Sequence, residues 1–385
     1  MMAFLIYLPT LAFMPHALYF LAIAYSFFRH WKMRREPLTQ SLMSSCQMDF
    51  GIIGLIVAFS AVNYFTGYGV EGLADGKIPS FFLIPFTMFI ALHIDKRDLQ
   101  ILVFLIFIES LFVFAEYLMG VSTFFSSLQR FREIGSDDLF YYNKPLGLSY
   151  NSSIVASKLF IAFLLLDLTG TRFIFKLFFQ FVFLMAIFLT FNRTVFLSIG
   201  FYIALKHLWR FLHGRYSLVK WDAYLLLLFT GLLLVSFLTI QYWDDILLQL
   251  TRKTGFIELS GRDRIWKHYI NFIGDNTLLG NHSLKYYFGP YHGHNSFIQL
   301  MATHGLIIAA LYIYLILRNV RGKNAILIMA TLSYCFFQYG IFWGISLMDV
   351  FFFFLLFRMR DVVPLVQGIH LADDSHGQSY HESEQ

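Results

Sequence analysis

Charged residues and cysteines are scarce in this chain of 385 residues. Asp, Glu, Lys and Arg make up only 14% of it, against about 25% in an average soluble domain, and apolar residues make up 58%. This composition excludes an ordinary soluble protein. The two cysteines, Cys46 and Cys335, lie far apart and in different surroundings, which argues against a disulfide, a metal cluster or redox chemistry.

Long apolar runs take the place of the missing charge. A helix needs about 20 apolar residues to cross a membrane, and eleven runs of 15 or more are present. We therefore predict an all-α, polytopic transmembrane helical bundle, forming a single domain over 1–363. The expected spans are 4–28, 50–66, 79–94, 99–119, 150–168, 173–191, 194–212, 221–241, 294–317, 324–340 and 342–357.

The basic residues predict the orientation of the bundle. If every run crosses once, segments on one side hold 17 of the 29 Lys and Arg residues, and the positive-inside rule makes that side cytoplasmic. The N-terminus is then expected outside, and 364–385 forms a disordered cytoplasmic tail. The outer side receives the longer connections 67–78, 120–149 and 242–293, of which the last is expected to be folded. The scattered basic residues argue against a nucleic-acid partner.

The loop 242–293 contains a helix signal. Ser260 and Asp263 are spaced as a capping box and Gly274 fits the position after a helix end, so a helix of about 13 residues is predicted. Arg262 lies over its apolar face near the N-terminus, where it would bind an anion or, alternatively, a lipid phosphate. Arg264 belongs to the polar face. The apolar face is expected to contain Ile265, Trp266, Tyr269, Ile270 and Ile273.

Another signal lies where this loop enters the helix expected over 294–317. Asn295 or Ser296 would cap that helix, which leaves His294 beside its positive dipole end. This position favours the neutral imidazole, which can accept a proton from a hydroxyl. A plain capping histidine is the alternative, and zinc binding lacks a supporting ligand pattern.

Ionisable residues interrupt the apolar runs at a few places. Arg193 lies in a tight turn on the outer side, against the charge bias, so it either has a function or extends toward the membrane surface. Glu109 and Lys158 are expected within spans, where they can pair with each other. Such a pair has either a functional role or the structural role of holding two helices together.

The order of these features resembles the O-antigen polymerase and O-antigen ligase superfamily, over about residues 185–320. The matching features are the Asn192-Arg193-Thr194 turn, Gly261-Arg262-x-x-Ile265-Trp266, Leu279-Gly280, and His294-Asn295 opening a helix that contains Gly305. The resemblance implies a C-type glycosyltransferase fold in the bacterial inner membrane. It also implies a donor glycan on undecaprenyl diphosphate, used on the periplasmic face without a metal or other cofactor.

The resemblance makes Arg193 and Arg262 diphosphate-binding residues and His294 the essential histidine. The chemistry agrees, because arginine binds a departing diphosphate through bidentate hydrogen bonds and a neutral histidine accepts the proton of an attacking hydroxyl. We therefore predict His294, Arg262 and Arg193 as catalytic residues. The further residues expected to bind substrate are Arg264, Trp266, Asn295, Arg132 and Lys158.

The acceptor distinguishes the alternatives within this family. A polymerase, which extends another lipid-linked repeat unit, is favoured over a ligase, which uses the lipid A core, because the charged loop 120–149 can hold a second glycan. A solute transporter should show broken helices or internal repeats around a midplane site, and the sequence contains no convincing repeat. The expected partners are the lipid-linked glycan, membrane lipid and, by the resemblance, a chain-length regulator protein.

Overall fold

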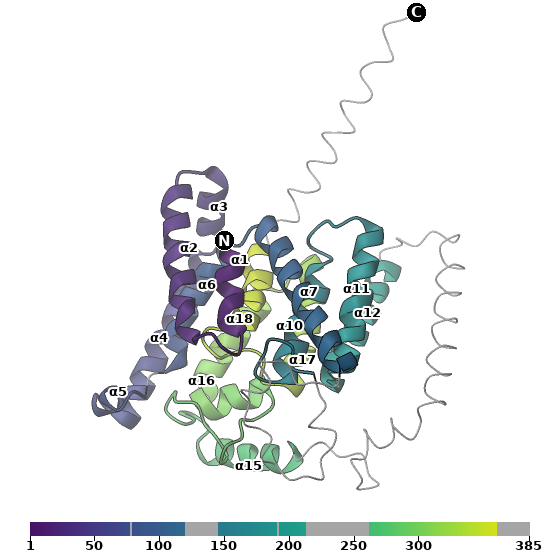
Figure 1. Ribbon diagram of the computed structural model, residues 1–385. Helices are drawn as coiled ribbons and strands as arrows, with labels where there is room; N and C mark the ends of the chain where they lie inside the picture. The colour runs from purple at the N-terminus through teal and green to yellow at the C-terminus, as the bar shows by residue number, and fades with distance from the viewer. Residues whose placement is uncertain (78, 120–144, 191, 213–261, 360–385) are drawn as a thin grey trace, which may run out of the picture.

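The computed structural model describes residues 1–77, 79–119, 145–190, 192–212 and 262–359. Within these ranges the protein contains fourteen α-helices and no β-strand, which confirms the predicted all-α class there. Figure 1 shows most helices running between two ends of a bundle. We call the end with α3 (Pro37–Ser45) the inner end, and the end with α15 (Arg262–Asp275) the outer end. The predicted span 221–241 and the tail 364–385 lie outside the described residues.

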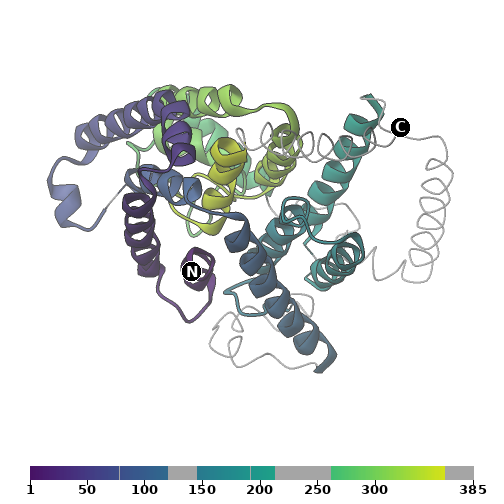
Figure 2. The same ribbon diagram turned by 90° about the horizontal axis from the view of Figure 1, so that it is seen from above.

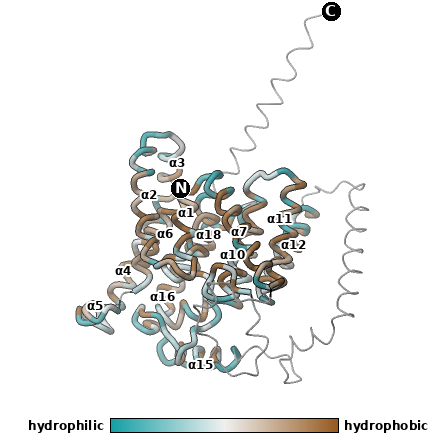
Figure 3. The backbone as a smooth tube through the Cα atoms, in the orientation of Figure 1, coloured by the Kyte–Doolittle hydropathy of each residue, from teal (hydrophilic) through white to brown (hydrophobic). Residues whose placement is uncertain are grey.

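Four helices are long and apolar enough to cross a membrane, which indicates a multi-pass membrane protein. They agree with the expected spans 50–66, 99–119, 194–212 and 294–317. Figure 3 shows apolar backbone concentrated between the two ends and hydrophilic segments at α3 and around α15. The four helices are α4 (Gln47–Tyr68), α7 (Lys96–Met119), α12 (Arg193–Leu212) and α16 (Ser296–Asn319).

The remaining apolar runs form shorter elements. Three match expected spans as single helices, α10 (Ser152–Leu165), α11 (Phe173–Leu189) and α17 (Gly322–Phe337). The run 79–94 forms a 3-10 turn at Ser80–Leu83 followed by α6 (Ile84–Leu92). The last run begins later than expected, with α18 (Leu347–Phe353) and a π-helical turn (Phe354–Arg358). Every residue of α18 is buried, and it lies among the other helices in Figure 2.

The first expected span, 4–28, is not one helix. It forms α1 (Met2–Tyr7) and α2 (Tyr19–Met33), which pack against each other as a hairpin, with 3-10 turns at Leu8–Thr10 and His16–Leu18 between them. Pro9 and Pro15 lie in this connection. Proline removes a backbone donor and clashes with the preceding turn, so two prolines six residues apart end the helix.

This hairpin corrects the predicted position of the N-terminus. The Met1 amino group lies 3.5 Å from Asp98 Oδ1, and Arg29, at the far end of the hairpin, donates to Asp98 Oδ2 at 2.8 Å. Both ends of the hairpin are therefore at the inner end of the bundle. The prediction that the N-terminus lies opposite Arg29 is wrong because it counted 4–28 as one crossing.

The predicted pair of Glu109 and Lys158 is confirmed inside the core. Lys158 Nζ lies 2.7 Å from Glu109 Oε2, and the two side chains are 1% and 0% exposed. Tyr7 donates to Glu109 at 2.8 Å, Ser149 donates to it at 2.8 Å, and Lys158 donates to Thr10 at 3.2 Å. This network joins the hairpin to α7 and α10.

A kink in α16 positions the chain that follows α15. Gly305 has φ +77°, and a Cβ there would lie 2.0 Å from the carbonyl oxygen of Leu278. This close approach needs glycine. The segment 277–283 lies along the kink, where Leu306 N donates to Thr277 O at 2.9 Å and Asn281 N donates to Ala302 O at 2.8 Å. The described part of the loop 242–293, which is 262–293, is therefore folded against α16 as predicted.

Candidate functional site

The helix α15 forms one wall of the site. It has 14 residues, close to the predicted length, although Ser260 lies outside the described residues and Gly274 falls inside the last turn. Ile265 and Tyr269 are buried against α16 as predicted. Ile270, another predicted member of the apolar face, is 58% exposed. It lies about 100° round the helix from Tyr269 and so points away from α16.

The start of α16 is capped by Asn295, one of the two predicted candidates. Its Oδ1 accepts from the amides of Phe297 at 2.8 Å and Ile298 at 3.0 Å. Ser296 instead joins α16 to the segment after α17, because its Oγ accepts from Gly340 N at 3.0 Å and donates to Gln338 O at 3.1 Å. Asn295 thus caps α16, and this cap holds the backbone next to His294 in place.

His294 is held in an uncommon conformation at this helix start. Its φ is +47°, a left-handed value that non-glycine residues seldom adopt and that is concentrated at functional sites. Its Nδ1 is buried and has no hydrogen-bond partner among the described residues. Its ring centroid lies 4.3 Å from that of His292. His294 therefore offers a buried ring nitrogen to a ligand.

The surroundings keep both histidines neutral. Burial and, second to it, the charge of Arg262 lower the pKa of His294 to about 4. Burial lowers the pKa of His292 to about 3, assisted by His294, Lys285 and Arg262. Near pH 7 both rings are uncharged, so His294 can accept a proton.

Arg262 is near enough to His294 for its charge to act on that ring, and its side chain reaches the end of α17. Its Nη1 donates to the Phe337 carbonyl at 2.8 Å, 75 residues away in sequence. Trp266, one turn further along α15, donates to the Gly293 carbonyl at 2.8 Å and so supports the loop that carries His294. The structure therefore brings the predicted residues Arg262, Trp266, His294 and Asn295 together.

Arg193 lies at the same end of the bundle as Arg262. It begins α12, which packs along α17, while Lys206 further along α12 binds Asp167 at the inner end at 2.5 Å. The start of α12 is therefore at the outer end. Arg264 is exposed on α15, and Lys158 is enclosed in the core with Glu109, so neither joins the histidines. Arg132 lies outside the described residues.

Three residues of the site were not predicted from the sequence. Lys285 Nζ lies 3.1 Å from the ring centroid of Trp343 and 4.6 Å from that of Tyr339. These two rings stack at 4.3 Å, and Tyr339 lies 5.5 Å from His292. Burial lowers the pKa of Lys285 to about 7, opposed by the charge of Asp349. The Lys285-Tyr286-Tyr287 run was visible in the sequence, but its contact with residues over 50 positions away was not.

No protein-family model matches the chain, and no curated protein matches it. Evidence for the chemistry of this protein therefore comes from the residues of the site. The outer end combines an arginine at a helix start, a neutral histidine with an available ring nitrogen, and an aromatic pair beside a lysine. Such a set can hold an anionic group, accept a proton from a hydroxyl and stack against a sugar ring.

The lowered pKa of His294 predicts a loss of stability in mild acid. Below pH 6.5 an unfolded chain takes up a proton at this position, whereas folded His294 takes it up only near pH 4. The free energy of unfolding should therefore fall between pH 6.5 and about 4 because of this group. Unfolding in detergent at pH 7.5 and pH 5 measures this loss, which should be smaller in His294→Asn. An equal loss in both proteins would contradict the prediction.

Proposed function

We propose that this chain is a metal-independent glycosyltransferase of the bacterial inner membrane. It joins oligosaccharide repeat units carried on undecaprenyl diphosphate, at the outer, periplasmic end of the bundle. The observation that carries this proposal is the neutral His294, with its left-handed backbone, within reach of the charge of Arg262 at the outer end of the bundle. Arg193 at the same end adds a second cation suited to a diphosphate.

The reaction follows from these groups. The hydroxyl oxygen of the acceptor sugar attacks the anomeric carbon of the donor, and the bond from that carbon to the diphosphate oxygen breaks. The hydroxyl proton passes to the His294 ring, whose Nδ1 is unpartnered in the described structure. The diphosphate leaves with the bonding electron pair, and Arg262 and Arg193 stabilise its charge. As the bound diphosphate offsets the charge of Arg262, the pKa of His294 rises and the ring becomes a better base.

The aromatic residues give the sugar a place to bind. Tyr339 and Trp343 stack beside His292, and tryptophan and tyrosine faces pack against the apolar faces of sugar rings. Lys285 covers the Trp343 face, so a sugar that uses this face displaces the lysine. The lysine then supplies a donor at the edge of the ring.

Glycan analysis of a host that lacks this protein tests the proposal. Gel electrophoresis of surface lipopolysaccharide should show a core with a single repeat unit, because ligation continues while polymerisation stops. Bare core with accumulated long lipid-linked chains would instead identify a ligase. Unchanged surface and lipid-linked glycan would overturn both assignments. Restoration of long chains by the wild-type gene on a plasmid is the control.

A further inference from the structure

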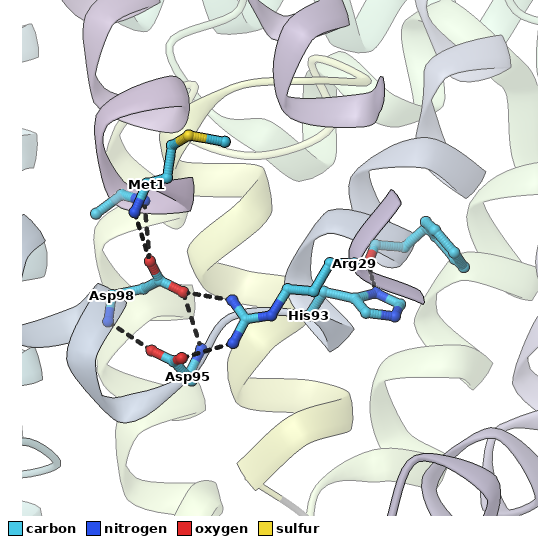
Figure 4. Close-up of polar contacts among 7 residues, drawn as sticks. Met1, Arg29, His93, Asp95 and Asp98 are labelled. Atoms are coloured by element: carbon cyan, nitrogen blue, oxygen red, sulfur yellow. Dashed lines mark hydrogen bonds and ion pairs between the residues drawn. The ribbon is translucent and has the colours of Figure 1, made fainter. Parts of the chain in front are cut away.

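An ion cluster at the inner end fastens the N-terminal hairpin. Arg29 of α2 donates to Asp95 at 2.5 Å and to Asp98 at 2.8 Å, and the Met1 amino group lies 3.5 Å from Asp98. Figure 4 shows Arg29 reaching both carboxylates while Met1 approaches Asp98 from another side. Two cations thus balance the two carboxylates of this cluster.

A cavity of about 770 Å³ lies next to this cluster, between α1, α2 and α7. Its volume falls within the range of roughly 300 to 1,000 Å³ that is usual for ligand sites. Part of its wall is apolar and comes from Phe4, Tyr25, Phe28 and Ile101. Phe4 and Phe28 are 45% and 57% exposed, so the apolar wall continues onto the outside of the bundle.

The polar part of the wall has an excess of positive charge. Lys32 and Arg97 line the cavity, are exposed, and form no ion pair with a carboxylate in the part of the chain that the structure describes. Among the described lining residues, Glu36 is the carboxylate that stands outside the ion cluster. The positive charges of Lys32 and Arg97 outnumber the negative charge of Glu36, so this wall can bind a negatively charged group.

We propose that this cavity binds an anionic phospholipid. Lys32 and Arg97 hold its phosphate, and an acyl chain lies along Phe4 and Phe28. The positive-inside rule assigns the inner end to the cytoplasmic leaflet, which carries anionic lipids. A soluble anion would leave the exposed aromatic wall unused, whereas a phospholipid covers the wall and the cations together. Lipid binding here is independent of any transfer reaction at the outer end.

Such a lipid would join the hairpin to the rest of the bundle. Lys32 belongs to α2 and Arg97 to α7, so one phosphate bridges two elements that Arg29 also connects. We therefore expect phosphatidylglycerol to bind to the purified full-length protein and to raise its unfolding temperature in a neutral detergent, and phosphatidylcholine to do neither.

Paired variants test the site by native mass spectrometry with phosphatidylglycerol. The variant Lys32→Gln with Arg97→Gln should bind phosphatidylglycerol at least about 10-fold more weakly than the wild type, because each basic residue near a membrane surface adds to the attraction of anionic lipid. The exchange Lys32→Arg with Arg97→Lys should keep binding. The matched control is Arg35→Gln with Arg172→Gln, two exposed cations of the inner end that do not line the cavity, and it should bind like the wild type.

Two results would overturn the proposal. One is equal phosphatidylglycerol binding by the wild type and by the Lys32→Gln, Arg97→Gln variant. The other is displacement of the lipid by glycerol 3-phosphate at equal concentration, because a free phosphate ester makes no use of the apolar wall. Circular dichroism and gel filtration of each variant show that a loss of binding is not a loss of folding.

Discussion

Replacing Arg262 or His294 is expected to lower glycosyl transfer by about 100-fold or more, without loss of folding. In the proposed reaction, Arg262→Ala removes a charge that stabilises the departing diphosphate. His294→Asn removes the proposed proton acceptor but keeps a residue that tolerates the left-handed backbone of this position, where φ is +47°. The two variants therefore separate the chemistry of these side chains from the backbone strain.

The measurement is extension of a lipid-linked repeat unit by purified protein in detergent. Lys267→Ala is the control for Arg262, because Lys267 is an exposed cation on the same helix. His16→Ala is the control for His294, because His16 is exposed in the hairpin connection. Both controls should keep wild-type rates. Normal transfer by folded Arg262→Ala and His294→Asn proteins would refute their catalytic roles.

Lys158→Met is expected to lower the free energy of unfolding by about 3 to 5 kcal/mol, because it leaves Glu109 buried without its cation. Removing the second charge as well should recover much of this loss. In Lys158→Met with Glu109→Gln neither of the two positions carries a charge, and Tyr7 still has an acceptor at position 109. The double variant should therefore be more stable than Lys158→Met alone.

Unfolding by denaturant in detergent micelles, with each variant compared to the wild type, measures these differences. Lys77→Met is the matched control, since Lys77 pairs with Asp75 at 3.2 Å but both side chains are at least half exposed. An exposed pair contributes only about 0 to 1 kcal/mol. Equal destabilisation by Lys77→Met and Lys158→Met would show that burial does not govern the cost at position 158.

Much of this protein was predictable because the relevant forces act locally along the chain. An apolar run long enough to cross a membrane must become a helix, since its backbone groups have no other partners there. This placed α4, α7, α12 and α16 closely. Asn295 was recognisable as a cap from its position alone. Glu109 and Lys158 were predictable as a pair because isolated charges in an apolar core are too costly.

Contacts between distant segments were decided only by the tertiary structure. The hairpin of α1 and α2 returns to the inner end because Met1 and Arg29 bind Asp98, about 70 to 100 residues away, which no local pattern encodes. Lys285 meets Trp343 because the chain after α15 docks onto the kink at Gly305. Such docking depends on the shapes of packed surfaces, whereas the sequence alone reports hydrophobicity, charge and local backbone preference.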